Sequence, residues 1–120
     1  MIVYLDTSVL VSAFTNELFS QMILDWLASR PGDLATSDWG VSEFSSALSM
    51  KIRMNRLDAN QRDRILSKLH EQLDRSITVL PVERRHFRQA ARFCDRAELG
   101  LRGADALHLA VVLDVGARLS

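Results

Sequence analysis

The sequence predicts an α/β domain in which helices cover a central parallel sheet. Three short apolar segments, residues 2–5, 34–36 and 77–80, alternate with longer segments of helical periodicity. Continuous apolar segments are typical of strands buried on both faces, and alternation of strands with helices is typical of parallel sheets. The 120 residues are enough for one hydrophobic core, so we expect a single domain.

Caps and helix breakers define the helices between these strands. Pro31 and Gly32 end the second helix, Ser37 or Asp38 caps the third, and Asp58 caps the fourth. The third and fourth helices have no strand between them and form an insertion into the alternation. The segment after the last helix begins a fourth strand. The predicted helices cover residues 8–14, 18–29, 38–52, 59–75, 83–98 and 102–115.

The composition excludes several classes of protein. Hydrophobic residues make up 48%, charged residues 25%, and the formal net charge is zero, as in an ordinary soluble globular protein. The apolar start lacks a basic leader, and no segment reaches the roughly 20 apolar residues of a membrane span, so we expect a cytoplasmic protein. The single cysteine, Cys94, excludes an internal disulfide and a cysteine metal cluster. Because it shares a helical face with Phe87, Ala90 and Ala91, we expect Cys94 in the core.

Three acidic residues stand beside apolar segments. Asp6 ends the first strand, at the edge where parallel sheets bind ligands, and Glu43 and Asp105 have apolar residues one turn away on both sides. Each acid has a structural explanation by itself: Asp6 as a helix cap, Glu43 as an ion-pair partner of an arginine, Asp105 as a favourable charge in a first helical turn. Three such acids together favour one shared site for a hard divalent cation that activates a water.

Neighbouring polar residues admit several roles. Thr7 and Ser8 lack a histidine–acid pair at recognisable spacing, so we expect them to hydrogen-bond to Asp6 or to a metal-bound water rather than to act as nucleophiles. His108 lies on an apolar helical stripe, and we expect a buried histidine with satisfied hydrogen bonds rather than a general base.

Basic residues are almost all arginine and gather in two places. Either these are solvated helix faces with local ion pairs, or they contact nucleic-acid phosphates or an acidic partner. The first group is a stripe that recurs every four residues, formed by Arg84, Arg88, Arg92 and Arg96. The second group lies near the end of the third helix and consists of Lys51, Arg53 and Arg56.

The second and third helices carry more large apolar side chains than one face of a thin sheet needs. We expect part of this surface to be covered by a second copy of the chain, most simply in a C₂ dimer, or by a partner segment. The residues concerned are Phe19, Met22, Trp26, Trp39 and Phe44.

Three segments resemble the PIN domain family, and within it the VapC-type ribonuclease toxins of bacterial toxin–antitoxin pairs. These are the strand ending in Asp6-Thr7-Ser8, the helical Ser42-Glu43-Phe44, and Leu-Arg-x-x-Asp-Ala-Leu-His-Leu-Ala at residues 101–110. The resemblance implies a three-layer fold with a parallel sheet of up to five strands. It also implies a Mg²⁺- or Mn²⁺-dependent endoribonuclease, a homodimer, and inhibition by a small antitoxin protein.

The resemblance also assigns roles to individual residues. Asp6, Glu43 and Asp105 match the acids that hold the metal and carry catalysis, and Thr7 and Ser8 match accessory polar positions. The family usually continues through a last strand into Thr-x-Asp, a fourth acid, whereas residues 1–120 end before that element. We therefore expect a domain without its final strand and helix. The alternative to a nuclease is then a catalytically impaired PIN-like module that binds RNA or protein.

Two other phosphate-handling classes fit poorly. A haloacid-dehalogenase-type phosphatase requires a second Asp where this chain has Ser8. A response-regulator receiver requires a phospho-acceptor after the third strand, where this chain has Leu80-Pro81-Val82.

Overall fold

Strands and helices alternate as the sequence predicts, with a helix pair inserted after the second strand. The computed structural model describes residues 2–15, 20–29, 33–116 and 118–119. Its elements are β1 (Ile2–Tyr4), α1 (Thr7–Thr15), α2 (Ser20–Ala28), β2 (Asp33–Ser37), α3 (Asp38–Arg53), α4 (Ala59–Arg75), β3 (Ile77–Leu80), α5 (Arg84–Asp95), the 3-10 helix η1 (Ala97–Leu99), α6 (Gly103–Val115) and β4 (Arg118–Leu119).

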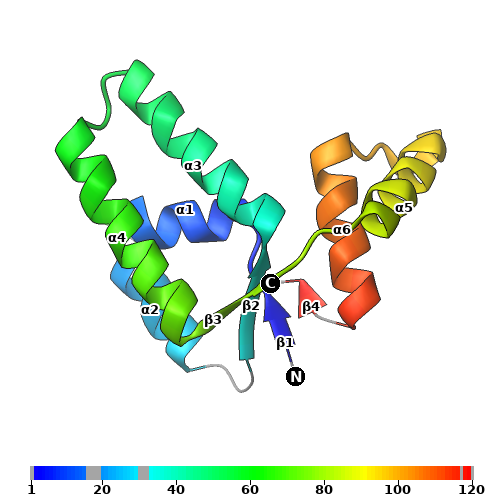
Figure 1. The fold of residues 1–120 in the computed structure, drawn as a ribbon, viewed down its shortest axis with the longest axis horizontal. Coiled ribbons are helices and arrows are strands. Elements are labelled where there is room, and N and C mark those ends of the chain that lie inside the picture. Colours follow the sequence, from blue (N-terminus) through cyan, green and yellow to red (C-terminus); the bar gives the residue numbers. More distant parts are fainter. Residues whose placement is uncertain (1, 16–19, 30–32, 117, 120) are drawn as a thin grey trace.

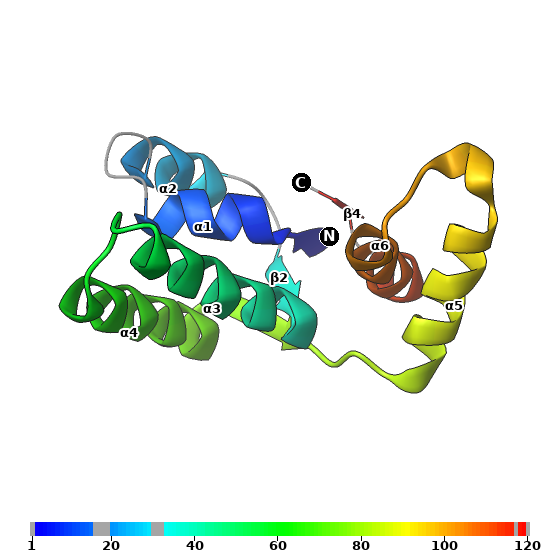
Figure 2. The same cartoon turned by 90° about the horizontal axis from the view of Figure 1, so that it is seen from above.

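The sheet separates two groups of helices. Its four described strands are parallel, in the order β3-β2-β1-β4. Helices α1 to α4 lie on one side of the sheet and α5 and α6 on the other, which is clear in both views (Figures 1 and 2). The α/β class and the three-layer arrangement predicted from the sequence are therefore confirmed.

Strand β1 contributes side chains to the cores on both faces of the sheet. Val3 and Leu5 pack with residues of α1, α3 and α4, whereas Tyr4 packs with Val111 and Val112 of α6. Successive side chains of a strand point to opposite faces, so a strand between two helix layers must be apolar throughout. This explains the continuous apolar start of the chain. No described helix is both long and apolar enough to cross a membrane.

The helix caps agree with the sequence in part. Asp58 caps α4, and Asp58 and Gln61 form the reciprocal bonds of a capping box. Ser37 caps α3 by accepting a hydrogen bond from the Gly40 N–H at 3.1 Å, and Asp38 is the first helical residue instead. The predicted helix over residues 83–98 ends earlier, at Asp95, and continues as η1.

The prediction that Cys94 lies in the core is wrong. Cys94 is exposed, and Phe87 on the same face is 54% exposed. Helix α5 instead buries His86 and Ala90. The helix is rotated toward His86 because this ring has polar partners on the inner side: its Nδ1 accepts from the Glu83 N–H at 2.9 Å, and its Nε2 lies 3.0 Å from an Asp114 oxygen.

Several of the large apolar residues expected at a partner surface have other positions. Phe44 is fully buried and packs edge-on against Phe14, with ring centroids 6.1 Å apart. Trp39 is partly buried against the α5–α6 core. Met22 and Trp26 of α2 are exposed, as expected for an uncovered surface. The prediction for Phe19 lies outside the described residues.

Candidate functional site

Asp6 follows β1 and caps helix α1. One carboxylate oxygen, Oδ1, accepts hydrogen bonds from the Val9 N–H at 3.1 Å and from the Ser8 hydroxyl at 2.8 Å. The expected bond between Ser8 and Asp6 is therefore present, and the capping role of Asp6 is real. No described residue donates to the other oxygen, Oδ2, so Asp6 can cap α1 and still offer an oxygen to a ligand.

Glu43 joins three parts of the chain. It lies on α3, half-buried, and its Oε1 accepts from the Thr7 hydroxyl at 2.7 Å and from His108 Nε2 of α6. Thr7 thus binds Glu43 rather than Asp6. The ion-pair partner expected for Glu43 was an arginine, whereas the structure gives it a histidine, His108. Both bonds fall on Oε1, and no described residue donates to Oε2.

His108 is nearly buried, at 8% exposure, and both of its ring nitrogens have partners. Nδ1 lies 2.6 Å from the Tyr4 hydroxyl, which in turn lies 2.8 Å from the Ser37 Oγ. The prediction of a buried histidine with satisfied hydrogen bonds is confirmed. The sequence reasoning missed Tyr4 and Ser37; the available signal was one phenol in an otherwise aliphatic strand, two residues before Asp6.

The Tyr4 hydroxyl lies within the electrostatic influence of Asp6 and Glu43. Burial raises the pKa of the Tyr4 hydroxyl above its ordinary value of 10.0, and the negative charges of Glu43 and Asp6 raise it further. Both carboxylates therefore act on the same hydroxyl group, which stays protonated at neutral pH.

Asp105 lies in the first turn of α6, one turn before His108, and is exposed. Helix dipoles favour an acid at this position. Among the described residues, no three His, Cys, Asp or Glu side chains lie close enough to hold a metal ion together. The donor chemistry nevertheless fits Mg²⁺ or Mn²⁺, because the carboxylates are hard oxygen ligands and Asp6 and Glu43 each keep one oxygen to which no described residue donates.

A groove of about 390 Å³ starts at Thr7 and Glu43 and follows α3. Thr7 and Glu43 line it together with Met50, Lys51 and Arg56. One of the two predicted basic groups is therefore next to Glu43. Its remaining member, Arg53, is exposed in the last turn of α3.

The arginines of α5 are exposed on the other side of the sheet (Figure 1). Arg92 donates to Gln89, and Arg96, the residue after α5, pairs with Glu98. Arg84 and Arg88 make no ion pair with any residue that the structure describes. Exposure is common to both explanations of the stripe, the solvated face and the binding surface.

The family assignment rests on almost the whole chain rather than on the residues of the site alone. The model of the PIN domain family matches residues 3–119, and the chain belongs to this family. No curated protein sequence matches it.

Solved structures of VapC-type toxins and toxin–antitoxin complexes share the fold. VapC20 of Mycobacterium tuberculosis, a toxin that cleaves the sarcin–ricin loop, has a TM-score of 0.72 and 19% identity over 96% of this chain and 84% of its own. VapBC2 of Rickettsia felis, bound to a DNA fragment from its promoter, has a TM-score of 0.71 and 18% identity over 99% and 85%. FitAcB of Neisseria gonorrhoeae has a TM-score of 0.69 and 21% identity over 99% and 85%. At these sequence identities, the structural similarity shows that this chain shares the fold of these proteins.

Proposed function

We propose that this protein is a metal-dependent endoribonuclease, the toxin of a bacterial toxin–antitoxin pair, which acts in the cytoplasm and hydrolyses RNA phosphodiester bonds. One observation carries the proposal: in a chain of the PIN family, Glu43 of α3 accepts a hydrogen bond from Thr7, the residue after Asp6, which brings α3 to the carboxyl end of β1. Ligands bind at this end of parallel sheets.

Asp6, Glu43 and Asp105 are the residues that would hold Mg²⁺ or Mn²⁺. A bound cation supplies a water of lowered pKa and neutralises charge on the phosphoryl group. The chain itself orients the acids: Ser8 and the Val9 N–H hold Asp6 through Oδ1. Thr7 holds Glu43 in the same way. Each carboxylate is thereby fixed through one oxygen while its other oxygen is left for the ligand.

The basic side chains supply contacts for the RNA backbone. Lys51 and Arg56 line the groove that starts at Glu43, so a strand with its scissile phosphate at the acids would place neighbouring phosphates beside them. Arg53 is exposed in the last turn of α3 and adds to this positive surface. Arg84, Arg88 and Arg92 form a separate positive stripe on α5, on the other side of the sheet, which we propose as a second RNA contact. Exchanging Arg88 and Arg92 for glutamate should weaken RNA binding at low salt while changing the free energy of unfolding by less than about 0.5 kcal/mol.

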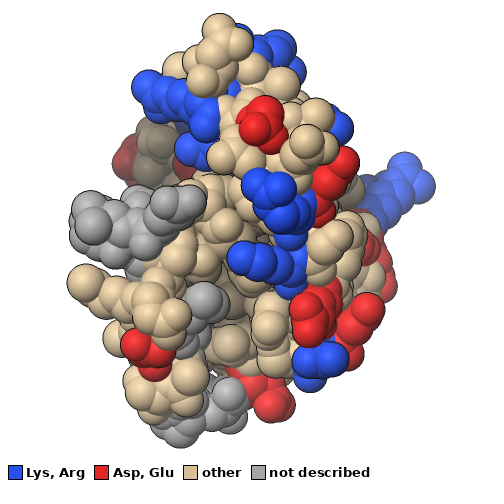
Figure 3. All heavy atoms as spheres, turned by 90° about the vertical axis from the view of Figure 1, so that its left-hand side faces the viewer, with Lys and Arg blue, Asp and Glu red and all other residues tan. Residues whose placement is uncertain are grey.

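An antitoxin and a second copy of the chain are the proposed protein partners. The Rickettsia, Neisseria and Klebsiella structures that share the fold are of toxin–antitoxin proteins. In this chain a groove of about 770 Å³ lies between α4 and the facing ends of α1 and α2, with Arg64 and Lys68 on its wall. Figure 3 views this side of the molecule, where blue basic side chains border a recessed tan surface.

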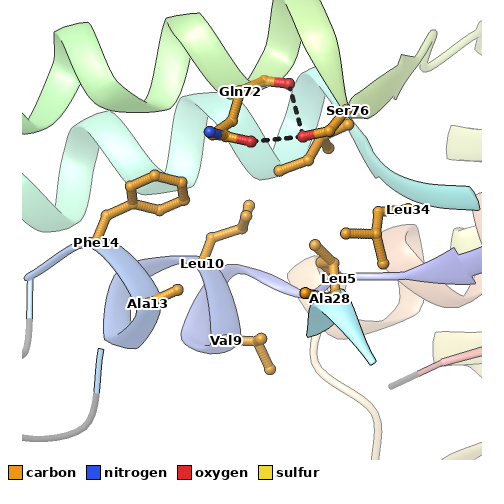
Figure 4. Close-up of a pocket in the computed structure, with 10 residues that line it drawn as sticks. Leu5, Val9, Leu10, Ala13, Phe14, Ala28, Leu34, Gln72 and Ser76 are labelled. Atoms are coloured by element: carbon orange, nitrogen blue, oxygen red, sulfur yellow. Dashed lines mark hydrogen bonds between the residues drawn. The ribbon is translucent and has the colours of Figure 1, made fainter. Parts of the chain in front are cut away.

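An apolar cavity lies deeper between the same helices and the sheet. It has about 250 Å³ and is lined by aliphatic residues of α1 and the sheet, with Phe14 on one side and, opposite, Gln72 of α4 and Ser76, which follows that helix (Figure 4). An amphipathic antitoxin helix fits such a surface, with its apolar face toward the cavity. A basic side chain of the antitoxin placed at the acids would replace the cation electrostatically. Titrating Mn²⁺ into the complex tests this: inhibitor affinity should fall as Mn²⁺ rises, and indifference to metal leaves only steric occlusion of the RNA.

A nuclease assay tests the proposed activity. Purified wild-type protein should cut RNA with Mg²⁺ or Mn²⁺ and lose this activity with a chelator, and Asp6→Asn should lose it while keeping the fold. The matched control is Asp25→Asn, an exposed acid on α2 that is remote from β1 in sequence; its carboxylate accepts from Gln21 and from no other side chain in the described part of the chain. It should retain full activity. Loss of activity in both variants would separate the activity from the Asp6 site.

The alternative is a catalytically impaired PIN-like module that binds RNA or protein without cutting. The observation in its favour is that the described acids do not form a three-ligand group. RNA binding by wild-type protein without cleavage in either metal would support this alternative and refute the nuclease.

A further inference from the structure

A chain of buried hydrogen bonds connects the start of α3 to Glu43. The Gly40 N–H donates to Ser37 Oγ at 3.1 Å, and Ser37 Oγ lies 2.8 Å from the Tyr4 hydroxyl. That hydroxyl lies 2.6 Å from His108 Nδ1, and His108 Nε2 contacts Glu43 Oε1. This network of hydrogen bonds therefore runs from Ser37 of β2 to Tyr4 of β1, and then through His108 of α6 to Glu43 in the candidate site.

For an ionised Glu43 and a neutral His108, the hydrogen bonds of this network all run in one direction. An ionised Glu43 only accepts, so His108 Nε2 carries a proton. In a neutral imidazole Nδ1 then accepts from the Tyr4 hydroxyl, and the Tyr4 oxygen accepts from the Ser37 hydroxyl. The Ser37 oxygen accepts from the Gly40 N–H. Every member then has a partner, which is the condition under which a buried polar network is stable.

The position of this network argues against a role in stability alone. Tyr4 is fully buried, in a strand between Val3 and Leu5, where an aliphatic side chain would need no hydrogen-bond partner. The network ends on Glu43, which is half-buried and lines the groove, rather than on another core residue. A polar network that leads out of the core to a carboxylate is placed to orient that carboxylate.

We propose that Tyr4 and His108 are positioning residues for Glu43. Together with Thr7 they hold Oε1 from two sides, which restricts the rotatable bonds of the glutamate and leaves Oε2 in one place for a ligand. Neither residue touches the RNA or a cation. The inference rests on the proposed function in one respect: it takes Glu43 as an acid that holds the cation of the proposed nuclease.

Variants at position 108 separate positioning from stability. His108→Leu keeps the volume but removes the donor to Glu43, and His108→Gln restores an N–H donor. Loss of an outer hydrogen-bond partner of a metal ligand typically costs about 10–100-fold in affinity or activity. We expect His108→Leu to weaken Mn²⁺ binding and lower kcat by this factor with little change in KM for RNA, and His108→Gln to recover most of both.

Two further variants make the test independent of misfolding. Tyr4→Phe removes one oxygen from the network and should give a smaller loss of the same kind. Val112→Ala, a buried neighbour of Tyr4 without polar contacts, should lower stability but leave kcat and Mn²⁺ affinity unchanged. Circular dichroism and urea unfolding establish that each variant is folded at the assay temperature.

The outcomes distinguish this inference from the proposed function. Wild-type protein that binds Mn²⁺ but does not cut RNA refutes the nuclease, while the Mn²⁺ affinities of the variants still test the positioning. Unchanged kcat and Mn²⁺ affinity in folded His108→Leu or Tyr4→Phe overturns the positioning role. Wild-type protein that neither binds Mn²⁺ nor cuts RNA overturns both.

Discussion

Gly40 allows α3 to begin close to strand β2, and replacing it with alanine tests this packing. A Cβ at position 40 would clash with the buried Thr36 Oγ1, whereas it would meet the His108 ring and Ser37 Oγ at 3.8 Å, an ordinary contact distance. Thr36 is therefore the residue that excludes a side chain at position 40.

Two opposing effects determine the magnitude for Gly40→Ala. Alanine favours a helix over glycine by about 0.5–1 kcal/mol, and overpacking of a well-packed interior costs about 1–3 kcal/mol. We expect the variant to be less stable than wild type by about 1–2 kcal/mol. In a Thr36→Ala background the clash is absent, so Gly40→Ala should stabilise by about 0.5–1 kcal/mol, and the sign of its effect reverses.

Urea unfolding followed by tryptophan fluorescence measures the free energy of unfolding of all four proteins in this double-mutant cycle. An unchanged dependence of this free energy on urea concentration is the check on two-state behaviour. Gly103→Ala is the matched control, because a Cβ at this helical glycine meets no atom within 4 Å, and it should stabilise the protein by a few tenths to about 1 kcal/mol. A Gly40→Ala protein as stable as the Gly103→Ala control would refute the close approach of α3 to β2.

Three further predictions concern stability. The hydrogen bond with His86 is the main reason that the pKa of Asp114 is lowered from 3.8. The stability that the Asp114 carboxylate contributes is therefore complete above about pH 4 and is lost as the pH falls through the lowered pKa. The difference in Tm between wild type and Asp114→Asn should shrink below pH 4, and a difference that grows there would contradict this. Phe44→Ala should cost about 3–5 kcal/mol in urea unfolding, because it removes a fully buried ring that packs against Phe14, and a cost below 1 kcal/mol would be inconsistent with this packing. Asp58→Ala should cost about 1 kcal/mol by the same measurement, through loss of the α4 cap, and an unchanged midpoint would exclude that cap.

The sequence by itself determined the class of fold and the places of most elements. Neighbouring residues were sufficient to predict an element where its stabilising interactions lie within a few residues. The capping box at Asp58 lies within one turn, and the apolar stripe of α4 repeats at helical spacing. The apolar segment at residues 2–5 indicated burial on both faces, which the two helix layers confirm. The motifs around Asp6, Glu43 and Asp105 also pointed to the PIN family, to which the chain belongs.

Only the tertiary structure decided which polar side chains meet. Glu43 and His108 are 65 residues apart, and their contact depends on α3 and α6 packing from opposite sides of the same strand. Sequence spacing reports the faces of one element but not the partner that another element brings. The same reason explains the wrong prediction for Cys94: His86 and Ala90 face inward on α5 because Asp114 of the neighbouring helix gives the buried imidazole a hydrogen-bond partner.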